Sequence, residues 1–374
     1  MSFYHYWQQL DWEQLGLRIH AATPADVERA LSRPRRTLED FAALISPAAE
    51  AYLSPMAAEA ERLTRQRFGH VVGFYLPLYL TNLCANDCSY CGFSMSNRIK
   101  RKVLDDAEVI AECEAIRALG FESLLLVTGE HETKAGMEYF RRMLPLVKPY
   151  AAYLSMEVQP LATEAYQELV TLGLDAVMVY QETYHAASYA RHHLRGRKQD
   201  MRWRMETPDR LGAAGVDKIG LGVLLGLEDW RCDSLMLAHH LSYLRQRWWQ
   251  SRYSISFPRL RPCTGGNIVK HPMSDRQLIQ LISAWRLLDP EVELSLSTRE
   301  SEAFRDGAIR CGITQASAGS STQPGGYANR QPELEQFAIH DARSAAEVAS
   351  RWQAQGIDVV WHDASSRPSS LSCR

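Results

Sequence analysis

The sequence predicts an α/β protein, a (β/α)8 barrel of the TIM type. From Val71 onward, eight short apolar runs rich in β-branched or aromatic residues alternate with longer helix-like stretches. Strands alternating with helices form parallel sheets, and eight such units close into a barrel or a partly opened relative of one. Polar residues follow the ends of these runs, where barrels of this kind carry their chemistry.

Residues 1–70 are predicted to form a helical extension ahead of the barrel. The stretch AATPADVERALS, at 21–32, contains a Thr-Pro pair typical of a helix start. The stretch MAAEAERLTRQRFG, at 56–69, ends on a glycine after basic residues, which is typical of a helix end. This segment therefore adds helices to the barrel but no predicted strand.

The barrel itself is expected to span residues 71–320. Its predicted strands are 71–80, 122–129, 152–158, 175–182, 218–226, 253–258, 292–299 and 313–319. The predicted helices between them are 105–120, 136–147, 163–173, 207–215, 234–248 and 275–288. With 46% hydrophobic residues among 374, the chain is long enough to bury one large core of this kind.

Residues 321–374 are expected to form a C-terminal cap. A helix is predicted at 344–355 and a strand at DVVWH, residues 358–362. No low-complexity linker and no short-period repeat indicates a second domain or a solenoid.

Charge and hydropathy narrow the classes of partner. Lys+Arg total 42 and Asp+Glu 44, for a net charge of -2, and no long run of one sign could follow a phosphate backbone, so we expect no nucleic acid. No stretch approaches about 18 uninterrupted apolar residues, and residues 1–16 contain no apolar signal core. We therefore expect a cytoplasmic protein that does not span a membrane.

Three of the eight cysteines lie in one short loop, TNLCANDCSYCGFSMSNR. Cys84, Cys88 and Cys91 follow the spacing CxxxCxxC, which lets three thiolates wrap a single [4Fe-4S] cluster. Such clusters are usually held by four cysteines, so three leave one iron open to another ligand. The alternative is a structural zinc site, but that normally needs four ligands in two paired arms, and the other cysteines form no second arm.

This loop resembles the cysteine motif of the radical S-adenosylmethionine (SAM) superfamily. The resemblance implies that the open iron binds the amino and carboxylate groups of SAM, and that an electron from the cluster cleaves SAM to a 5'-deoxyadenosyl radical. Tyr90 matches the aromatic position that packs on the adenine, with ordinary core packing as the alternative, and Phe93 is assigned to the cofactor with it. Thr128, Gly129 and Glu130 resemble the GGE motif, which holds the SAM ammonium group.

Two further residues are candidate ligands for the polar groups of SAM. Glu157 follows the third predicted strand, and a buried carboxylate can pair with a ribose or an ammonium group. Arg204 offers a guanidinium fork that can clasp a carboxylate. Salt bridges at the barrel rim are the alternative for both.

Longer strings resemble the 2-iminoacetate synthases, the tyrosine lyases of thiamine biosynthesis. They cover nearly the whole chain and include FYLPLYLTNLCANDCSYCGFSMSNRIKRK, VMVYQETYH, SFPRLRPCTGG, LSLSTRE and QASAGSSTQPGGY. The resemblance implies that the radical takes a hydrogen from L-tyrosine, whose Cα–Cβ bond breaks to give 2-iminoacetate (dehydroglycine) and p-cresol. It also implies thiazole synthase, ThiG, as the partner that receives dehydroglycine, and a reductant such as flavodoxin.

The resemblance assigns the substrate carboxylate to Arg299 and to Ser317, at the ends of the seventh and eighth predicted strands. The alternatives are an ion pair of Arg299 with Glu300 or Glu302, and a Ser317 that only makes room. The residue that acts as the accompanying base stays open. The nominees are Glu182, Tyr184 and Arg259.

Three other functions are alternatives to a tyrosine lyase of thiamine biosynthesis. The first is a tyrosine-cleaving maturase of iron hydrogenase, HydG, which carries a second cluster on a C-terminal CxxC arm; the late cysteines here, Cys311 and Cys373, form no CxxC. A tryptophan lyase differs by its substrate alone. A non-catalytic iron-sulfur or zinc scaffold would not need the polar residues that follow the predicted strands.

Overall fold

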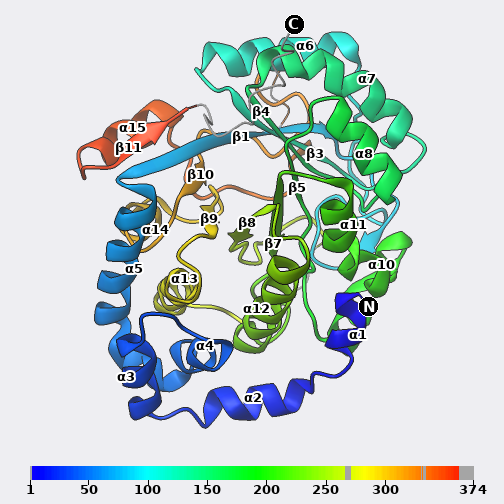
Figure 1. Cartoon of the computed structure of the whole chain (residues 1–374). Helices are drawn as coiled ribbons and strands as arrows, with labels where there is room; N and C mark the ends of the chain where they lie inside the picture. Colours follow the sequence, from blue (N-terminus) through cyan, green and yellow to red (C-terminus); the bar gives the residue numbers. More distant parts are fainter. Residues whose placement is uncertain (1, 266–270, 330, 332–333, 362–374) are drawn as a thin grey trace, which may run out of the picture.

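A computed structural model describes residues 2–265, 271–329, 331 and 334–361, and it contains a closed barrel of eight parallel strands (Figure 1). The barrel closes because β1 pairs with β3 on one side and with β10 on the other. Each strand lies inside its predicted run or extends at most one residue beyond it, although several strands are shorter than the runs. The predicted fold is therefore confirmed. The barrel strands are β1 (Val71–Thr81), β3 (Ser123–Thr128), β4 (Tyr153–Glu157), β5 (Ala176–Met178), β7 (Lys218–Gly222), β8 (Arg252–Ser256), β9 (Glu293–Leu296) and β10 (Gln315–Ser317).

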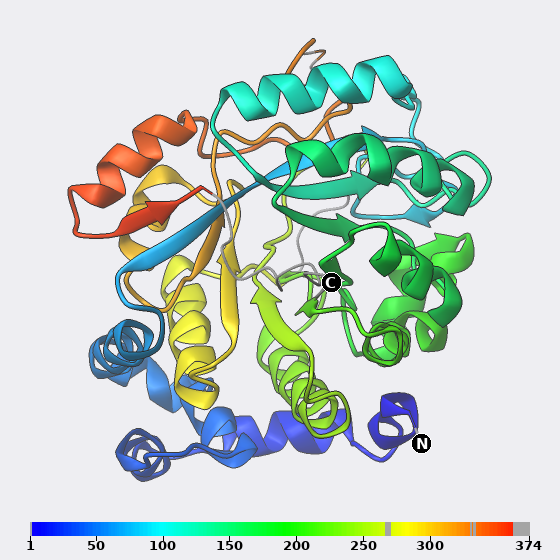
Figure 2. The same cartoon turned by 45° about the horizontal axis from the view of Figure 1, so that its top comes forward.

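Helices surround the barrel on its outside (Figure 2). Capping boxes begin two of them, because the side chains of Asp105 and Ser274 accept hydrogen bonds from the third helical N–H group. The six predicted helices are confirmed, whereas the short α14 was not predicted. The outer helices are α6 (Asp106–Ala118), α7 (Met137–Val147), α8 (Thr163–Thr171), α11 (Thr207–Ala214), α12 (Trp230–Arg247), α13 (Asp275–Leu288) and α14 (Glu302–Ala308).

The N-terminal helices pack on the outer barrel helices, with α5 against α13 and α2 against α12 (Figure 1). The first of them is fixed by Phe3, which is fully buried and stacks on His240 with 3.9 Å between ring centroids. The extension thus joins the core. Its elements are α1 (Phe3–Trp7), α2 (Trp12–His20), α3 (Pro24–Ser32), α4 (Leu38–Leu44), the 3₁₀ helix η1 (Pro47–Tyr52) and α5 (Leu53–Phe68).

The C-terminal segment also joins the barrel. The predicted helix is α15 (Ala345–Gln353), and the predicted strand is β11 (Asp358–Val360), which pairs in parallel with the start of β1. His362, the last residue of the predicted strand, lies outside the described residues. The boundaries at residues 70 and 320 stay predictions, because segments on both sides of the barrel pack against it.

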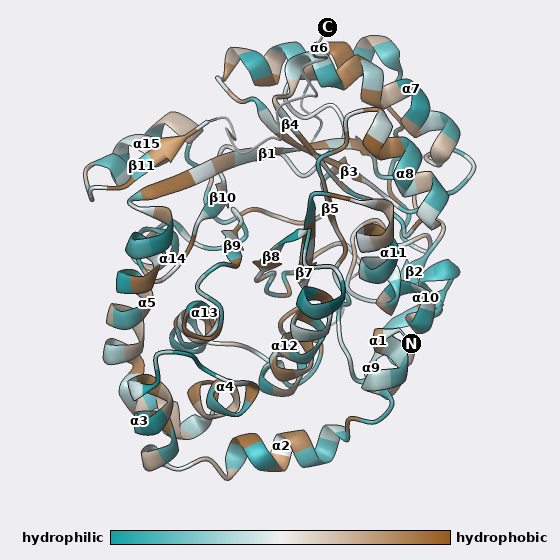
Figure 3. Cartoon of the chain, in the orientation of Figure 1, coloured by the Kyte–Doolittle hydropathy of each residue, from teal (hydrophilic) through white to brown (hydrophobic). Residues whose placement is uncertain are grey.

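The hydrophobic core lies between the sheet and the helices, as the apolar colouring of β1 and β3 in Figure 3 shows. All six residues of β3 are buried, and one face of α7 covers the sheet with Tyr139, Phe140, Met143, Leu144 and Val147. Burying a large apolar side chain contributes about 1.5–3 kcal/mol. No helix in the described part of the chain is long and apolar enough to cross a membrane.

Candidate active site

The cysteine loop follows β1 and is tied down at two points. The two-residue strand β2 (Asp87–Cys88) pairs antiparallel with β6 (His193–Arg195), which follows α9 (Ala186–His192). Arg101 donates hydrogen bonds to four backbone carbonyls of the loop, those of Asn82, Phe93, Ser94 and Asn97. No sequence pattern predicts the role of Arg101, because these acceptors are backbone groups.

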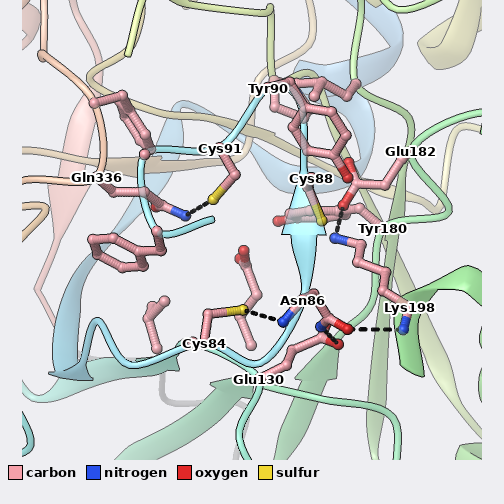
Figure 4. A pocket seen from close by; sticks show the side chains of 18 of the residues that line it. Cys84, Asn86, Cys88, Tyr90, Cys91, Glu130, Tyr180, Glu182, Lys198 and Gln336 are labelled. Carbon is pink, nitrogen blue, oxygen red and sulfur yellow. Dashed lines mark hydrogen bonds and ion pairs between the residues drawn. The ribbon is translucent and has the colours of Figure 1, made fainter. Parts of the chain in front are cut away.

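The three cysteines of the loop line one cavity, which holds about 980 Å³ of empty space including its open mouth (Figure 4). All three are free thiols. Burial raises the pKa of the Cys84 thiol to about 11 and also raises the pKa of Cys88. A buried thiol of this kind loses its proton readily only beside a cation, and a metal supplies one.

The number of thiols in the cavity favours a cluster over a structural zinc ion. Among the described residues, no three His, Cys, Asp or Glu side chains lie close enough together to hold one ion. A structural zinc ion needs its ligands within about 2.3 Å of one centre. The thiolates of a cuboidal cluster each bind a different iron, so they stand farther apart. Three free thiols in one cavity fit a [4Fe-4S] cluster that leaves one iron open to another ligand.

The end of β3 packs against the cysteine loop at Gly129. A Cβ atom at Gly129 would lie 2.3 Å from the carbonyl oxygen of Leu83 and 3.2 Å from Cβ of Cys84, so only glycine fits. Next to it, the buried hydroxyl of Thr128 has no hydrogen-bond partner among the described residues. Thr128, Gly129 and Glu130 all line the cavity, which leaves polar groups directed at a ligand.

Glu130 and Glu182 form a buried network with two cations. Glu130 binds Arg204 at 3.0 Å and accepts a hydrogen bond from Asn86 at 2.7 Å, while Glu182 binds Lys198 at 2.7 Å. Burial alone would raise the pKa of each carboxyl, but Arg204 and Lys198 bring both pKa values below their usual level. Glu182 is therefore ionised and a weak base in this arrangement. Lys198 and Asn86 were not predicted.

Two aromatic side chains complete the wall beside the cysteines. The hydroxyl of Tyr90 lies 2.7 Å from Nε2 of His193, whose Nδ1 lies 2.7 Å from the carbonyl oxygen of Tyr189. Nδ1 must donate to that carbonyl, so Nε2 accepts the hydrogen bond from Tyr90. Phe93 is buried, and both Tyr90 and Phe93 line the cavity.

A second cavity of about 640 Å³ adjoins the first. The two share part of their walls, including Glu157 at the end of β4 and Arg299 after β9. Burial raises the pKa of Glu157 to about 7, against an opposing effect of Arg299. The shared wall therefore places the carboxyl group of Glu157 and the guanidinium group of Arg299 between the cysteine cavity and the second cavity.

The guanidinium group of Arg299 forms no hydrogen bond or ion pair with any described residue, and it stacks on the ring of Phe337 at 3.6 Å. The alternative ion pairs are not formed: Glu300 instead binds Arg259 and Arg261. Ser317 also lines the second cavity, where its hydroxyl accepts a hydrogen bond from the backbone N–H of Thr298. Arg299 is thus available to an anionic ligand.

Two nominees for the base lie in other surroundings. Arg259 is held by the carboxylate of Glu300. The hydroxyl of Tyr184 is hydrogen bonded to His240 at 2.8 Å, under α12, and Tyr184 lines neither cavity. The structure thus gives neither residue a free polar group at the shared wall.

Comparisons with known proteins show which families the chain resembles. The radical SAM superfamily model matches residues 78–237, and the model of the Biotin and Thiamin Synthesis associated domain matches residues 256–358. The chain is 62% identical over 363 residues to the 2-iminoacetate synthases of Escherichia coli (strain K12) and Salmonella typhimurium (strain LT2), covering 97% of this chain and 96% of each relative.

Solved structures extend the comparison to the fold. HydG, a maturase of the [FeFe]-hydrogenase, superposes with a TM-score of 0.87 at 31% identity, covering 96% of this chain and 80% of that one. Methylornithine synthase (PylB), at 18% identity and a TM-score of 0.70, shares the fold. With 62% identity over nearly its whole length to two such enzymes, the chain belongs to the 2-iminoacetate synthase family of the radical SAM superfamily.

Proposed function

We propose that the two adjoining cavities form the active site in which this chain cleaves the Cα–Cβ bond of L-tyrosine. The products are 2-iminoacetate and p-cresol, with 5'-deoxyadenosine and methionine as co-products, so the enzyme is a carbon–carbon lyase. The observation that carries the proposal is the wall that two cavities share. One cavity contains three free cysteines, and the other contains an arginine that has no anionic partner among the described residues.

A [4Fe-4S] cluster and SAM are the cofactors, and the cysteine cavity supplies groups for both. Cys84, Cys88 and Cys91 would hold the cluster. When bound, the cluster and SAM supply the 5'-deoxyadenosyl radical that starts the reaction. Gly129 brings its strand end close to the cysteine loop, and the ionised Glu130 can accept hydrogen bonds from the ammonium group of SAM.

The other residues of this cavity hold and orient. Arg204 fixes Glu130 through their ion pair, and Glu182 keeps Lys198 and Arg204 in place. We assign Tyr90 and Phe93 to packing against the adenosyl group, and Glu157 to its ribose or to the ammonium group. These assignments are supported by the position of each side chain in the cavity wall.

The second cavity is proposed to hold tyrosine, with its carboxylate on Arg299. A guanidinium group binds a carboxylate through two parallel hydrogen bonds. The flat face of the Arg299 guanidinium stacks on Phe337, so its N–H groups, which lie in the plane of the guanidinium, can still donate. Ser317 can add a hydroxyl hydrogen bond at the same site.

We further propose how the chain operates in the cell. 2-Iminoacetate is an imine that water hydrolyses, so direct transfer to thiazole synthase, ThiG, would protect it on the way to the thiazole of thiamine. A reductant such as flavodoxin would supply the electron. Cys84, Cys88 and Cys91 form no disulfide bond with a described residue, which supports a reducing compartment, the cytoplasm. We also retain the division into an extension (1–70), a barrel (71–320) and a cap (321–374).

The test is an anaerobic assay of the reconstituted protein with SAM, dithionite and L-tyrosine, following 5'-deoxyadenosine and p-cresol. Cys88→Ala should abolish both products, whereas Cys113→Ala, at a buried cysteine of α6 outside both cavities, should retain them. 5'-Deoxyadenosine without p-cresol would contradict tyrosine as the substrate, and L-tryptophan is then the next substrate to test. A cluster-loaded sample that forms neither product would contradict the lyase activity itself.

A further inference from the structure

A side chain of the C-terminal segment reaches the cysteine cavity. The amide Nε2 of Gln336 donates a hydrogen bond to Sγ of Cys91, with 3.6 Å between the two atoms (Figure 4). Hydrogen bonds to the sulfurs of an iron-sulfur cluster help to set its reduction potential. We propose that Gln336 is a positioning residue that raises the reduction potential of the cluster. This inference rests on the proposed function, because it requires a cluster on Cys91.

The orientation of the amide is fixed from its other side. The hydroxyl of Tyr79, a buried residue of β1, donates a hydrogen bond to Oε1 of Gln336 at 2.8 Å. A thiolate of a cluster can only accept a hydrogen bond, so the NH₂ group is the one that must face Cys91. Tyr79 therefore selects the amide orientation in which Gln336 is a donor to the sulfur.

The backbone of the same segment is held against the cysteine loop. The N–H of Gln336 donates to the carbonyl of Thr322 at 3.0 Å, and the hydroxyl of Thr322 donates to the carbonyl of Phe337 at 2.9 Å. A Cβ atom on Gly92 would lie 2.2 Å from the carbonyl oxygen of Gln336, so this contact requires a glycine in the loop. These contacts hold the donor beside Cys91, so the side chain needs little further ordering.

The direction of the effect follows from charge. A hydrogen bond withdraws electron density from the thiolate, and this stabilises the reduced cluster more than the oxidised one because the reduced cluster carries one more negative charge. Loss of the donor should therefore make the potential more negative. A residue that merely joined the cap to the loop would leave the potential of the bound cluster unchanged.

The experiment compares reconstituted full-length variants by EPR-monitored redox titration, without SAM or tyrosine. Gln336→Leu removes the donor at similar size, and Gln336→Glu keeps the acceptor for Tyr79 but places a negative charge beside the sulfur. Tyr79→Phe removes only the group that orients the amide. The matched control is Gln331→Leu, in the same segment, whose side chain binds Lys100 and not the cysteine loop.

We expect the midpoint potential to become more negative in the order Tyr79→Phe, Gln336→Leu and Gln336→Glu, with Gln331→Leu at the wild-type value. Wild-type potentials in Gln336→Leu and Gln336→Glu overturn the inference. If Gln336→Leu takes up no cluster, the other two variants decide, and wild-type potentials in both overturn it. Absence of a cluster from the wild-type protein would instead contradict the proposed function.

Discussion

Replacing Arg299 by methionine removes the guanidinium group that is proposed to bind the substrate carboxylate. Methionine keeps an unbranched side chain that can still contact Phe337, so the main change is the loss of two charge-assisted hydrogen bonds. Each contributes about 1.5–3 kcal/mol. The expected loss is therefore about 3–6 kcal/mol, or about 10²–10⁴-fold in kcat/KM for tyrosine, since 1.4 kcal/mol corresponds to about tenfold. Arg299→Lys keeps the charge but not the fork, and should lose about half of that free energy.

The assay is p-cresol formation by the reconstituted variants over a range of tyrosine concentrations. Tyramine, which lacks the carboxylate, serves as a competitive ligand that separates the carboxylate contact from the rest of the cavity. Arg299→Met should weaken the binding of tyrosine and leave the inhibition constant of tyramine within about threefold, because the lost partner is absent from tyramine. Equal weakening of both ligands would instead show that Arg299 shapes the cavity without binding the carboxylate.

Three further predictions concern the framework of the site. Gly129→Ala should reduce iron content and lower the free energy of unfolding by about 1–3 kcal/mol, because its Cβ would collide with the cysteine loop; Gly307→Ala, which meets nothing within 4 Å, should be tolerated. Asp341→Asn should cost about 3–5 kcal/mol in chemical denaturation at pH 7, because it breaks a fully buried pair with Arg305. Phe3→Ala should cost about 3–5 kcal/mol in the same measurement, because Phe3 is fully buried on His240.

The Asp341 prediction has a pH dependence of known sign. Burial would raise its pKa, but Arg343 and Arg305 bring the pKa of Asp341 below its ordinary value. A carboxyl with a lowered pKa in the folded state stabilises the protein above the ordinary pKa, and this contribution is lost as the pH falls through the folded value. The Asp341→Asn variant should therefore differ most from wild type near neutral pH and least in acid. A constant difference down to the most acidic pH that the fold survives would contradict this account.

The alternation of apolar runs and helical stretches was sufficient to predict the barrel, because each strand carries its own local signal. All eight strands lie inside the predicted runs or extend at most one residue beyond them. By contrast, α14 has seven residues and is too short to show a helical periodicity. The cysteines, Glu130 and Arg299 could be nominated because each lies at or just after a predicted strand end. Lys198 and Gln336 could not, since both lie in segments without a regular period and reach the site only through the tertiary fold.

The charges of the site support the proposed places of SAM and tyrosine. Glu130 and Glu182 pair with Arg204 and Lys198 within the wall, so these four charges balance one another. Glu157 and Arg299 are part of the wall that the two cavities share. Neither side chain forms a hydrogen bond with another described residue. In the proposed arrangement, Glu157 pairs with the ribose or the ammonium group of SAM, and Arg299 binds the carboxylate of tyrosine. An ammonium group beside Glu157 would lower its raised pKa. This complementarity arises from which pairs form in the folded chain, and a list of strand-end residues cannot reveal it.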